Sequence, residues 1–235
     1  MSMQAVFLAA GLGTRLKPIT YHIPKPMIRV AGKNLLEHNL DQLPNEIDEI
    51  IIVVGHLSEQ IENHFGKEYK GRKVKYIKQR KFLGTCYALG LCKDVLKDRF
   101  LVIMGDDIYC RSDIEECLKF PQAMLAKEIS GKFIGGRIKF NKSGHLEDII
   151  EGTHKRKKSL VNTGLYVINK HFFDYKPEPI VGGKEFGLPQ TLVKMSDQYS
   201  IQIVKANFWL QINDISGLKR AEKILKSKKL CLKKN

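Results

Sequence analysis

Short apolar runs alternate with amphipathic stretches along roughly the first half of the chain. The apolar and β-branched runs, which are typical of buried strands, are residues 4–9, 49–55, 73–77 and 100–105. Between them apolar residues recur at helical spacing, and the helices predicted in this way are 34–43, 58–66 and 85–96. Strands and helices in this order predict an α/β fold of Rossmann-like kind, with a mixed, mostly parallel sheet and helices on both faces.

The pattern changes after about residue 115, where strands become shorter and glycine turns more frequent. We expect strands at 132–140, 145–150 and 165–168, with a hairpin turn at Asn141–Gly144, and a last helix at 218–225. No linker rich in proline or serine separates the two parts. The chain is therefore predicted to be a single domain, 1–235, whose halves 1–115 and 116–235 share one sheet, the second half being a smaller α+β lobe.

Composition is that of an ordinary globular protein, with 43% hydrophobic residues in a chain of 235. No run approaches the ~20 apolar residues of a membrane span. The apolar stretch near the N-terminus is short and broken by glycine, so it indicates a strand and not a secretory leader, and the expected location is cytoplasmic. The five cysteines form no Cys-Xaa-Xaa-Cys pair, which argues against a disulfide framework or a zinc site.

Charge is the unusual bulk property, with a formal net value of +15. The cations gather at 67–81, at 155–158 and in a lysine-rich C-terminal segment. Such runs are compatible with a solvated surface, with steering of anionic substrates, or with binding of nucleic acid or another acidic surface. No zinc-finger or RNP pattern accompanies the runs, so nucleic acid is the least favoured partner.

The first strand runs into a glycine-rich loop with two cations, Gly11-Leu-Gly-Thr-Arg15, followed by Pro24-Lys-Pro-Met27. Glycines at a strand end let backbone N–H groups approach an anion, so this pattern indicates a phosphate site. It lacks the Lys-Ser/Thr pair of a P-loop. It also has Leu16 where a dinucleotide fingerprint needs its third glycine, which leaves NAD binding weakly supported.

Together, Leu8-Ala-Ala-Gly-Leu-Gly-Thr-Arg-Leu-Lys-Pro18 and Pro24-Lys-Pro-Met27 resemble the opening of the sugar-phosphate nucleotidyltransferases, the pyrophosphorylases that make nucleotide sugars. The resemblance implies that Arg15 holds the triphosphate and that Lys25 bridges the reacting phosphates. It also implies that the half 1–115 binds the nucleotide and that the half 116–235 binds the sugar phosphate. The loop residues that it assigns to the nucleotide are Leu8, Ala10, Gly11, Gly13, Thr14 and Arg15.

Asp106 directly follows the apolar strand, where a carboxylate suits Mg²⁺ bound together with phosphate oxygens and water. The resemblance makes Asp106 a metal ligand in the nucleotide site and gives Asp107 only a weak assisting role. The motifs are most similar to the uridylyltransferase domain of the N-acetylglucosamine-1-phosphate enzyme, which has an asparagine ligand that matches Asn213. Asp214 is the alternative ligand, and Gln211 stands where thymidylyltransferases have their aspartate.

The same uridylyltransferase domain has glutamine and Gly-Thr residues that match Gln79, Gly84 and Thr85, and the resemblance assigns them to the pyrimidine. A primary amide offers both a donor and an acceptor, as uracil and thymine require. By the same comparison Gly136, Glu151 and Asn162 bind the sugar. Many relatives carry a lysine where this chain has Gly152, so a phosphate contact is either missing or supplied by Lys155 or Lys158.

The predicted reaction condenses UTP or dTTP with a sugar 1-phosphate, with Mg²⁺ as cofactor, to give a nucleotide sugar and pyrophosphate without a nucleophilic side chain. The alternatives are mannose 1-phosphate with GTP, phosphocholine with CTP, a catalytically silent nucleotide-sugar sensor, and a basic nucleic-acid-binding protein. The expected partners are the nucleoside triphosphate and the sugar 1-phosphate, and no membrane. No hexapeptide repeats occur, so we expect no attached acetyltransferase.

Overall fold

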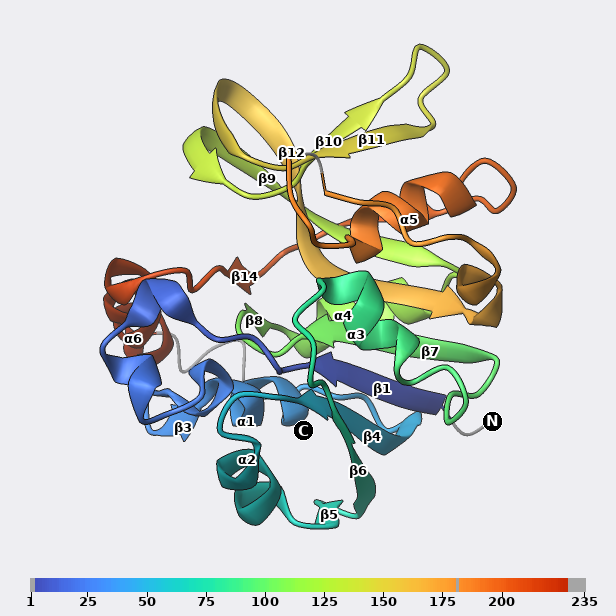
Figure 1. The fold of residues 1–235 in the computed structure, drawn as a ribbon. Coiled ribbons are helices and arrows are strands. Elements are labelled where there is room, and N and C mark those ends of the chain that lie inside the picture. The colour runs from blue at the N-terminus through green and yellow to red at the C-terminus, as the bar shows by residue number, and fades with distance from the viewer. Residues whose placement is uncertain (1–2, 181, 228–235) are drawn as a thin grey trace.

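One mixed sheet organises the molecule in the computed structural model, which describes residues 3–180 and 182–227 (Figure 1). Its parallel centre consists, in spatial order, of β7 (Arg99–Met104), β1 (Met3–Leu8), β4 (Ile47–Val54) and β6 (Arg72–Lys78). Beyond β6 lies the antiparallel β5 (Glu68–Tyr69). Beyond β7 lie β12 (Thr153–Asn169), β10 (Arg137–Phe140) and β11 (Leu146–Ile150). β9 (Ala123–Ile134) also pairs with β12, and β13 (Gln202–Lys205) pairs with β9. The predicted α/β class is confirmed.

Helices cover both faces of this sheet because successive residues of its central strands point to opposite sides. In β1, Ala5 and Phe7 pack with α1 (Leu35–Leu40), α2 (Ser58–Phe65) and α4 (Arg111–Leu118). Val6 and Leu8 pack on the other face with α3 (Thr85–Gly90) and α5 (Leu188–Met195). A third apolar cluster joins α6 (Ile215–Ser227) to three short strands, β2 (Arg29–Val30), β8 (Ile108–Tyr109) and β14 (Trp209–Leu210).

β12 connects the two halves of the chain. Its C-terminal part pairs antiparallel with β7, from Leu165 opposite Ile103 to Asn169 opposite Arg99. Its N-terminal part leaves the central sheet and forms a curved two-stranded ribbon with β9, at the top left of Figure 1. One sheet therefore contains strands from both parts of the chain.

Several element boundaries differ from the expectation. The helix expected at 85–96 ends at Gly90, after which the N–H of Cys92 donates to the Leu89 carbonyl and the N–H of Lys93 to the Gly90 carbonyl, as in turns. Cys92 and Leu96 are buried in this stretch. The strand expected at 132–140 is two strands, β9 and β10, separated at Gly135 and Gly136. The strand expected at 165–168 is only the last part of β12.

Other local predictions are confirmed. Gly66 ends α2 with a φ of 60°, a conformation that favours glycine. Gly144 has a φ of 80° and closes the hairpin between β10 and β11, where its N–H donates to the carbonyl of Asn141. Cys86, Cys92, Cys110 and Cys117 are free and buried, whereas Cys231 and the lysine-rich C-terminal residues 228–235 lie outside the described residues. No helix within 3–180 and 182–227 is both long and apolar enough to cross a membrane.

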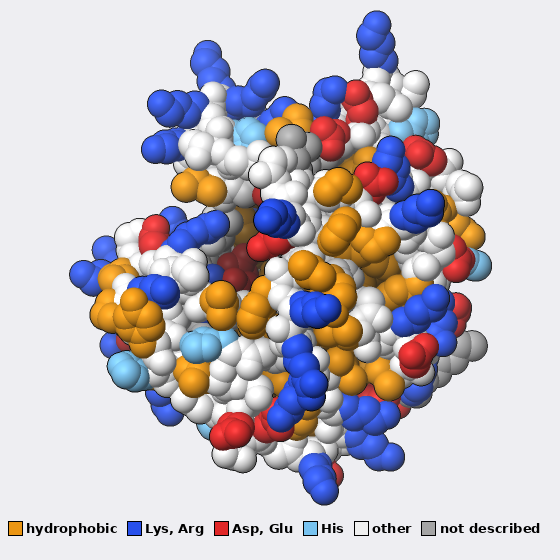
Figure 2. Space-filling view, in the orientation of Figure 1, with side chains coloured by type: hydrophobic (Ala, Val, Ile, Leu, Met, Phe, Trp, Pro, Cys, Tyr) orange, Lys and Arg blue, Asp and Glu red, His pale blue; other side chains and the backbone are white. Residues whose placement is uncertain are grey.

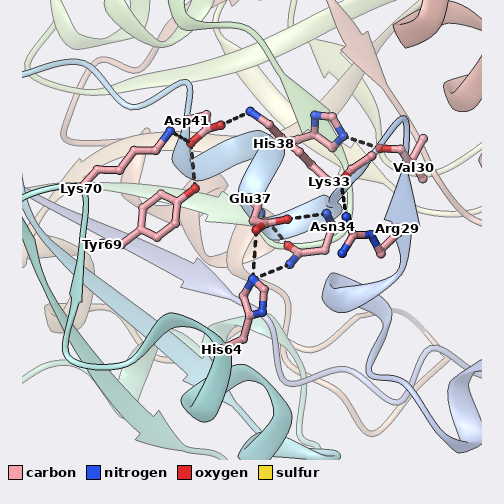
Figure 3. Close-up of polar contacts among 11 residues, drawn as sticks. Arg29, Val30, Lys33, Asn34, Glu37, His38, Asp41, His64, Tyr69 and Lys70 are labelled. Atoms are coloured by element: carbon pink, nitrogen blue, oxygen red, sulfur yellow. Dashed lines mark hydrogen bonds and ion pairs between the residues drawn. The ribbon is translucent and has the colours of Figure 1, made fainter.

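Polar contacts at both ends of α1 attach this helix to neighbouring segments (Figure 3). Asn34 caps the helix, since its Oδ1 accepts from the N–H of Glu37 and the Glu37 carboxylate accepts from the N–H of Asn34. At the other end, Asp41 accepts hydrogen bonds from Lys33, from Lys70 at 2.5 Å and from the Tyr69 hydroxyl at 2.8 Å. One carboxylate therefore ties α1 to the segments before it and to β5.

We predict that Asp41→Asn weakens the fold in a pH-dependent way. Burial alone would raise the pKa of Asp41, but the hydrogen bonds from Lys33, Lys70 and Tyr69 lower it below 3.8. A lowered pKa stabilises the fold above the unfolded-state value and loses that effect as the pH falls through the folded-state value. Urea unfolding should therefore show a loss of about 1–3 kcal/mol at pH 7 that shrinks below about pH 4.

Asp174→Asn is the matched control for this experiment. Its side chain is 69% exposed and pairs with the exposed His171, so the expected change is below about 1 kcal/mol at either pH. A loss for Asp41→Asn that is equal at pH 7 and pH 3 would contradict the role given to the Asp41 carboxylate.

Candidate active site

A cavity of about 530 Å³ opens at the carboxyl ends of β1 and β7, where ligands commonly bind in open α/β sheets. Figure 2 shows a hollow on this face with acidic side chains inside it. The wall is formed by the glycine loop after β1, the turn after β6, the end of β7 and the segment after β14. The predicted residues on this wall are Leu8, Ala10, Gly11, Gly13, Thr14, Arg15, Lys25, Gln79, Gly84, Thr85, Asp106 and Asn213.

The glycine loop depends on its second glycine more than on its first. Gly13 has a φ of 61°, and a Cβ there would lie 2.8 Å from the Cγ2 of Thr20. The Thr20 hydroxyl donates to the Gly13 carbonyl at 2.9 Å and fixes the turn. A Cβ on Gly11 would meet nothing within 4 Å, so its backbone borders open space in the cavity.

Two cations reach the cavity from different turns. Lys25 lies in a 3-10 turn, Lys25–Met27, and its side chain is only 11% exposed. Its Nζ lies 2.7 Å from Oδ2 of Asp106, at the end of β7. Arg15, in the 3-10 turn Thr14–Leu16, is exposed, and no carboxylate among residues 3–180 and 182–227 pairs with it. The site thus presents one fixed cation and one that is available to an incoming anion.

Asp106 and Asn213 are the predicted wall residues that suit a magnesium ion. They offer a carboxylate and an amide oxygen, which are hard ligands of the kind Mg²⁺ prefers when phosphate oxygens and water complete its shell. The described part of the chain contains no group of three or more His, Cys, Asp or Glu residues that could hold a metal without such help. The donor set therefore fits an ion that arrives with a polyphosphate.

The neighbours considered as further ligands have other partners. Asp214 Oδ1 accepts from the Ser216 hydroxyl at 2.6 Å and from the Gly217 N–H at 2.8 Å, at the start of α6. The Gln211 side chain donates to the carbonyl of Ile134. Neither residue lies on the cavity wall.

Asp107, for which the resemblance implied only a weak assisting role, lies outside the cavity lining, and its carboxylate is buried beside the wall. Its Oδ1 accepts from the N–H of Ile212 and its Oδ2 from Nε1 of Trp209, both at 3.0 Å. Burial, followed by the nearby Asp106 carboxylate, raises the pKa of Asp107 to about 7. Asp107 belongs to the framework behind the site.

The turn after β6 forms the other end of the cavity. Gln79 is 8% exposed, and its Nε2 donates to the carbonyl of Lys81 at 3.0 Å. Gly84 has a φ of 94°, and its missing side chain allows the backbone of Phe186 to approach. The Thr85 hydroxyl accepts from the N–H of Leu188 at 2.9 Å. This turn is therefore joined to the segment that precedes α5.

Sequence reasoning missed several wall residues, among them Leu12, Phe82, Met104 and Glu185. Leu12, Phe82 and Met104 lie between or beside predicted residues, and Phe82, an aromatic residue directly after the basic run 67–81, was a usable signal. Glu185 comes from a segment without a motif. The bridge between Pro179 and Phe186 and the contacts of Phe186 with the turn at Gly84 bring it to the cavity.

The predicted sugar residues form a second group beyond Met104. The N–H of Asn162 donates to the carbonyl of Gly136 at 2.9 Å, and a Cβ on Gly136 would lie 2.7 Å from Oε1 of Glu151. Asn162 Oδ1 accepts from the N–H of Gly164, which packs on Met104 at the cavity wall. Burial raises the pKa of the Glu151 carboxyl group. The three residues are brought together, but they lie outside the lining of the 530 Å³ cavity.

Lys155 and Lys158 were considered as substitutes for the lysine that many relatives have in place of Gly152, but neither lines the cavity. Gly152 has a φ of 137°, and its carbonyl accepts from the N–H of Gly135. Lys158 Nζ lies 3.0 Å from the Glu128 carboxylate on the exposed β9–β12 ribbon. Lys155 stands opposite Lys132 on the same ribbon. The structure gives no contact between these side chains and the site.

Comparisons with known proteins agree with this geometry. The family model described as nucleotidyl transferase matches residues 4–227. The bifunctional protein GlmU of Methanocaldococcus jannaschii is 31% identical over 228 residues, which cover 96% of this chain and 55% of that protein. The UTP–glucose-1-phosphate uridylyltransferase AglF of Haloferax volcanii is 33% identical over 180 residues, 73% of this chain and 74% of that protein.

The chain thus spans about half the length of the GlmU relatives that it matches. Among solved structures, a putative glucose-1-phosphate thymidylyltransferase from Bacillus anthracis superposes with a TM-score of 0.80 at 24% identity and covers 97% of both chains. HddC from Yersinia pseudotuberculosis superposes with a TM-score of 0.73 at 23% identity. At this identity the two structures show the shared fold.

Proposed function

Because this chain belongs to the nucleotidyl transferase family, we propose that it joins a pyrimidine nucleoside triphosphate to a sugar 1-phosphate and releases pyrophosphate. The supporting observation is that one cavity holds the glycine loop, the Lys25–Asp106 pair and Gln79 on its wall. Of UTP and dTTP, we propose UTP, because the relative from Haloferax volcanii is named a UTP–glucose-1-phosphate uridylyltransferase. The second substrate is then a hexose 1-phosphate.

The proposed chemistry is a single in-line displacement. A phosphate oxygen of the sugar 1-phosphate forms a bond to the α-phosphorus, while the bond from the α-phosphorus to the oxygen of the β-phosphate breaks and pyrophosphate leaves. Arg15 and Lys25 offset the crowded negative charge and align the two phosphates. Asp106 holds the ammonium group of Lys25 in place before substrate binds.

Magnesium is the proposed cofactor, and Asp106 and Asn213 are the residues that would hold it. When bound, Mg²⁺ neutralises phosphate charge and orients the triphosphate. Asp106 would serve both Lys25 and the ion. This joint role fits a carboxylate with two oxygens, since Lys25 contacts Oδ2.

The proposal is tested by offering each of the four nucleoside triphosphates, and dTTP, with glucose, N-acetylglucosamine and mannose 1-phosphates, and with phosphocholine, in the presence of Mg²⁺. Pyrophosphate release with UTP and a hexose 1-phosphate supports it. Release only with GTP and mannose 1-phosphate, or only with CTP and phosphocholine, selects one of those enzymes. Nucleotide-sugar binding without release identifies a sensor, and salt-sensitive nucleic-acid binding without nucleotide binding overturns the enzyme assignment.

We predict that Gln79→Leu weakens UTP binding selectively. The buried amide offers a donor and an acceptor to N3–H and a carbonyl of uracil, and losing both bonds costs about 1.5–3 kcal/mol. The KM for UTP should rise about 10–100-fold, with little change in the KM for the sugar 1-phosphate. Gln60→Leu, at an exposed amide that donates to the His22 carbonyl, should change neither value. An unchanged KM for UTP in Gln79→Leu would remove Gln79 from base recognition.

A further inference from the structure

Asp107 is next to the proposed metal ligand Asp106, yet it faces away from the cavity. Its side chain is buried, and both of its oxygens have partners at 3.0 Å, the N–H of Ile212 and Nε1 of Trp209. These two donors belong to the segment that leads directly to Asn213. The carboxylate of Asp107 therefore spans the gap between the strand end that carries one proposed ligand and the segment that carries the other.

The backbone of Asp107 is fixed from its other side. The Asn39 side chain, fully buried on α1, donates to the Asp107 carbonyl at 2.6 Å and accepts from the N–H of Tyr109 at 3.2 Å. The end of β7 is thus attached to α1, and through Asp107 the attachment continues to residues 209–212. The Asp107 carboxylate thus links the end of β7, which α1 holds in place, to the segment that precedes Asn213.

The segment before Asn213 has little secondary structure of its own. β14 pairs with β8 through only two residue pairs, Trp209 with Tyr109 and Leu210 with Ile108. So short a pairing is marginal without support from side chains. The residue after Asn213 is fixed to α6, because the N–H of Leu218 donates to the Asp214 carbonyl at 3.1 Å. On the other side, the Ile212–Asp107 bond is the attachment that follows Leu210. Asp107 therefore fixes the segment that enters Asn213.

We propose that Asp107 is a positioning residue that joins the end of β7 to residues 209–212 and thereby sets Asn213 beside Asp106 for one metal ion. The inference rests on the proposed function for the metal roles of Asp106 and Asn213. A carboxylate is required because it accepts from two donors at once, whereas asparagine would place its own N–H₂ group against one of them. In Asp107→Asn one buried donor loses its partner.

The chain provides a spectroscopic probe and a matched control for this proposal. Trp209 is the single tryptophan of the sequence, so its emission reports on the Asp107 contact without any substrate. Asp113 is also buried and also accepts from two donors of the same stretch, Asn207 Nδ2 at 2.7 Å and the N–H of Phe208 at 3.0 Å. Asp113→Asn therefore removes a similar attachment farther from Asn213.

The experiment compares Asp107→Asn, Asp113→Asn and the unaltered chain. Tryptophan emission and its quenching by acrylamide are measured first, without ligands, and UTP binding is then followed by calorimetry over a range of Mg²⁺ concentrations. Pyrophosphate release gives the half-maximal Mg²⁺ concentration. Asp107→Asn should change the emission and raise the half-maximal Mg²⁺ concentration about tenfold in both assays. Asp113→Asn should lower the thermal stability as much as Asp107→Asn does, but it should leave the half-maximal Mg²⁺ concentration unchanged.

Trp209→Phe removes only one of the two donors and serves if Asp107→Asn does not fold. It should raise the Mg²⁺ requirement by a smaller factor than Asp107→Asn, because the Ile212 bond remains. An equal Mg²⁺ shift in Asp107→Asn and Asp113→Asn, or none in Asp107→Asn and Trp209→Phe, would overturn the positioning role. If the unaltered chain releases no pyrophosphate, the proposed function fails, while emission and the Mg²⁺ dependence of UTP binding still test Asp107.

Discussion

Lys25→Ala should reduce the turnover of the proposed reaction by on the order of a hundredfold, with little change in the free energy of unfolding. The Lys25 ammonium is held in the cavity at 2.7 Å from Asp106, where it can meet the charge that develops on the phosphates. Removing one such preorganised group typically costs about 3 kcal/mol of transition-state stabilisation. Its partner Asp106 is 40% exposed and can be hydrated when the lysine is lost, so the fold should tolerate the change.

Initial rates of pyrophosphate release at saturating UTP and sugar 1-phosphate measure this effect. Lys119→Ala is the control, because Lys119 is 64% exposed and pairs only with the exposed Glu116 on α4. An exposed pair of this kind is worth below about 1 kcal/mol, and turnover should not change. Equal rates in the two variants would mean that Lys25 has no part in the chemistry.

Gly84→Ala should lower both the stability of the fold and the affinity for UTP. A Cβ on Gly84 would lie 2.4 Å from the carbonyl oxygen and 2.7 Å from the nitrogen of Phe186, which are backbone atoms that no rotamer change can move. Phe186 is held by its N–H bond to the Leu83 carbonyl and by the N–H of Cys86 on its own carbonyl. The turn and the segment with Glu185 must therefore separate.

The expected loss for Gly84→Ala is about 2–5 kcal/mol of unfolding free energy, of which about 1–2 comes from the positive φ and about 1–3 from overpacking. Gly144→Ala isolates the first contribution, since Gly144 has a φ of 80° but a Cβ there would meet nothing within 4 Å. Denaturant unfolding and UTP calorimetry of both variants give the comparison. If Gly144→Ala is as damaging as Gly84→Ala, the close approach of Phe186 is unimportant.

Local patterns predict much of this fold because the central strands are buried on both faces. The run at 49–55 corresponds to β4, Ile47–Val54, and the run at 100–105 to β7, Arg99–Met104. Strands of this kind are recognisable without knowing their neighbours. The break at Gly135 and Gly136 was not predicted, because it depends on the hydrogen bond from Gly135 to Gly152.

The candidate site was also predicted only in part from the sequence. The resemblance to the sugar-phosphate nucleotidyltransferases indicated Lys25, Gln79, Asp106 and Asn213, and the structure places all four on one cavity wall, although their roles stay predictions. Contacts between distant segments could not be read from any motif. The bond from Trp209 to Asp107 joins residues 102 positions apart, and it gives Asp107 a different place from the one expected.

The path of β12 decides where the chain could be cut to exchange the predicted sugar-binding residues. Since β12 pairs with β7 at one end and with β9 at the other, a chimera cut near residue 115 would separate strands of one sheet. The β10–β11 hairpin offers better crossover points, because Gly135 and Gly152 are hydrogen-bonded to each other at its base. A graft between these glycines replaces Gly136 and Glu151 while leaving the β12 scaffold and Asn162 intact.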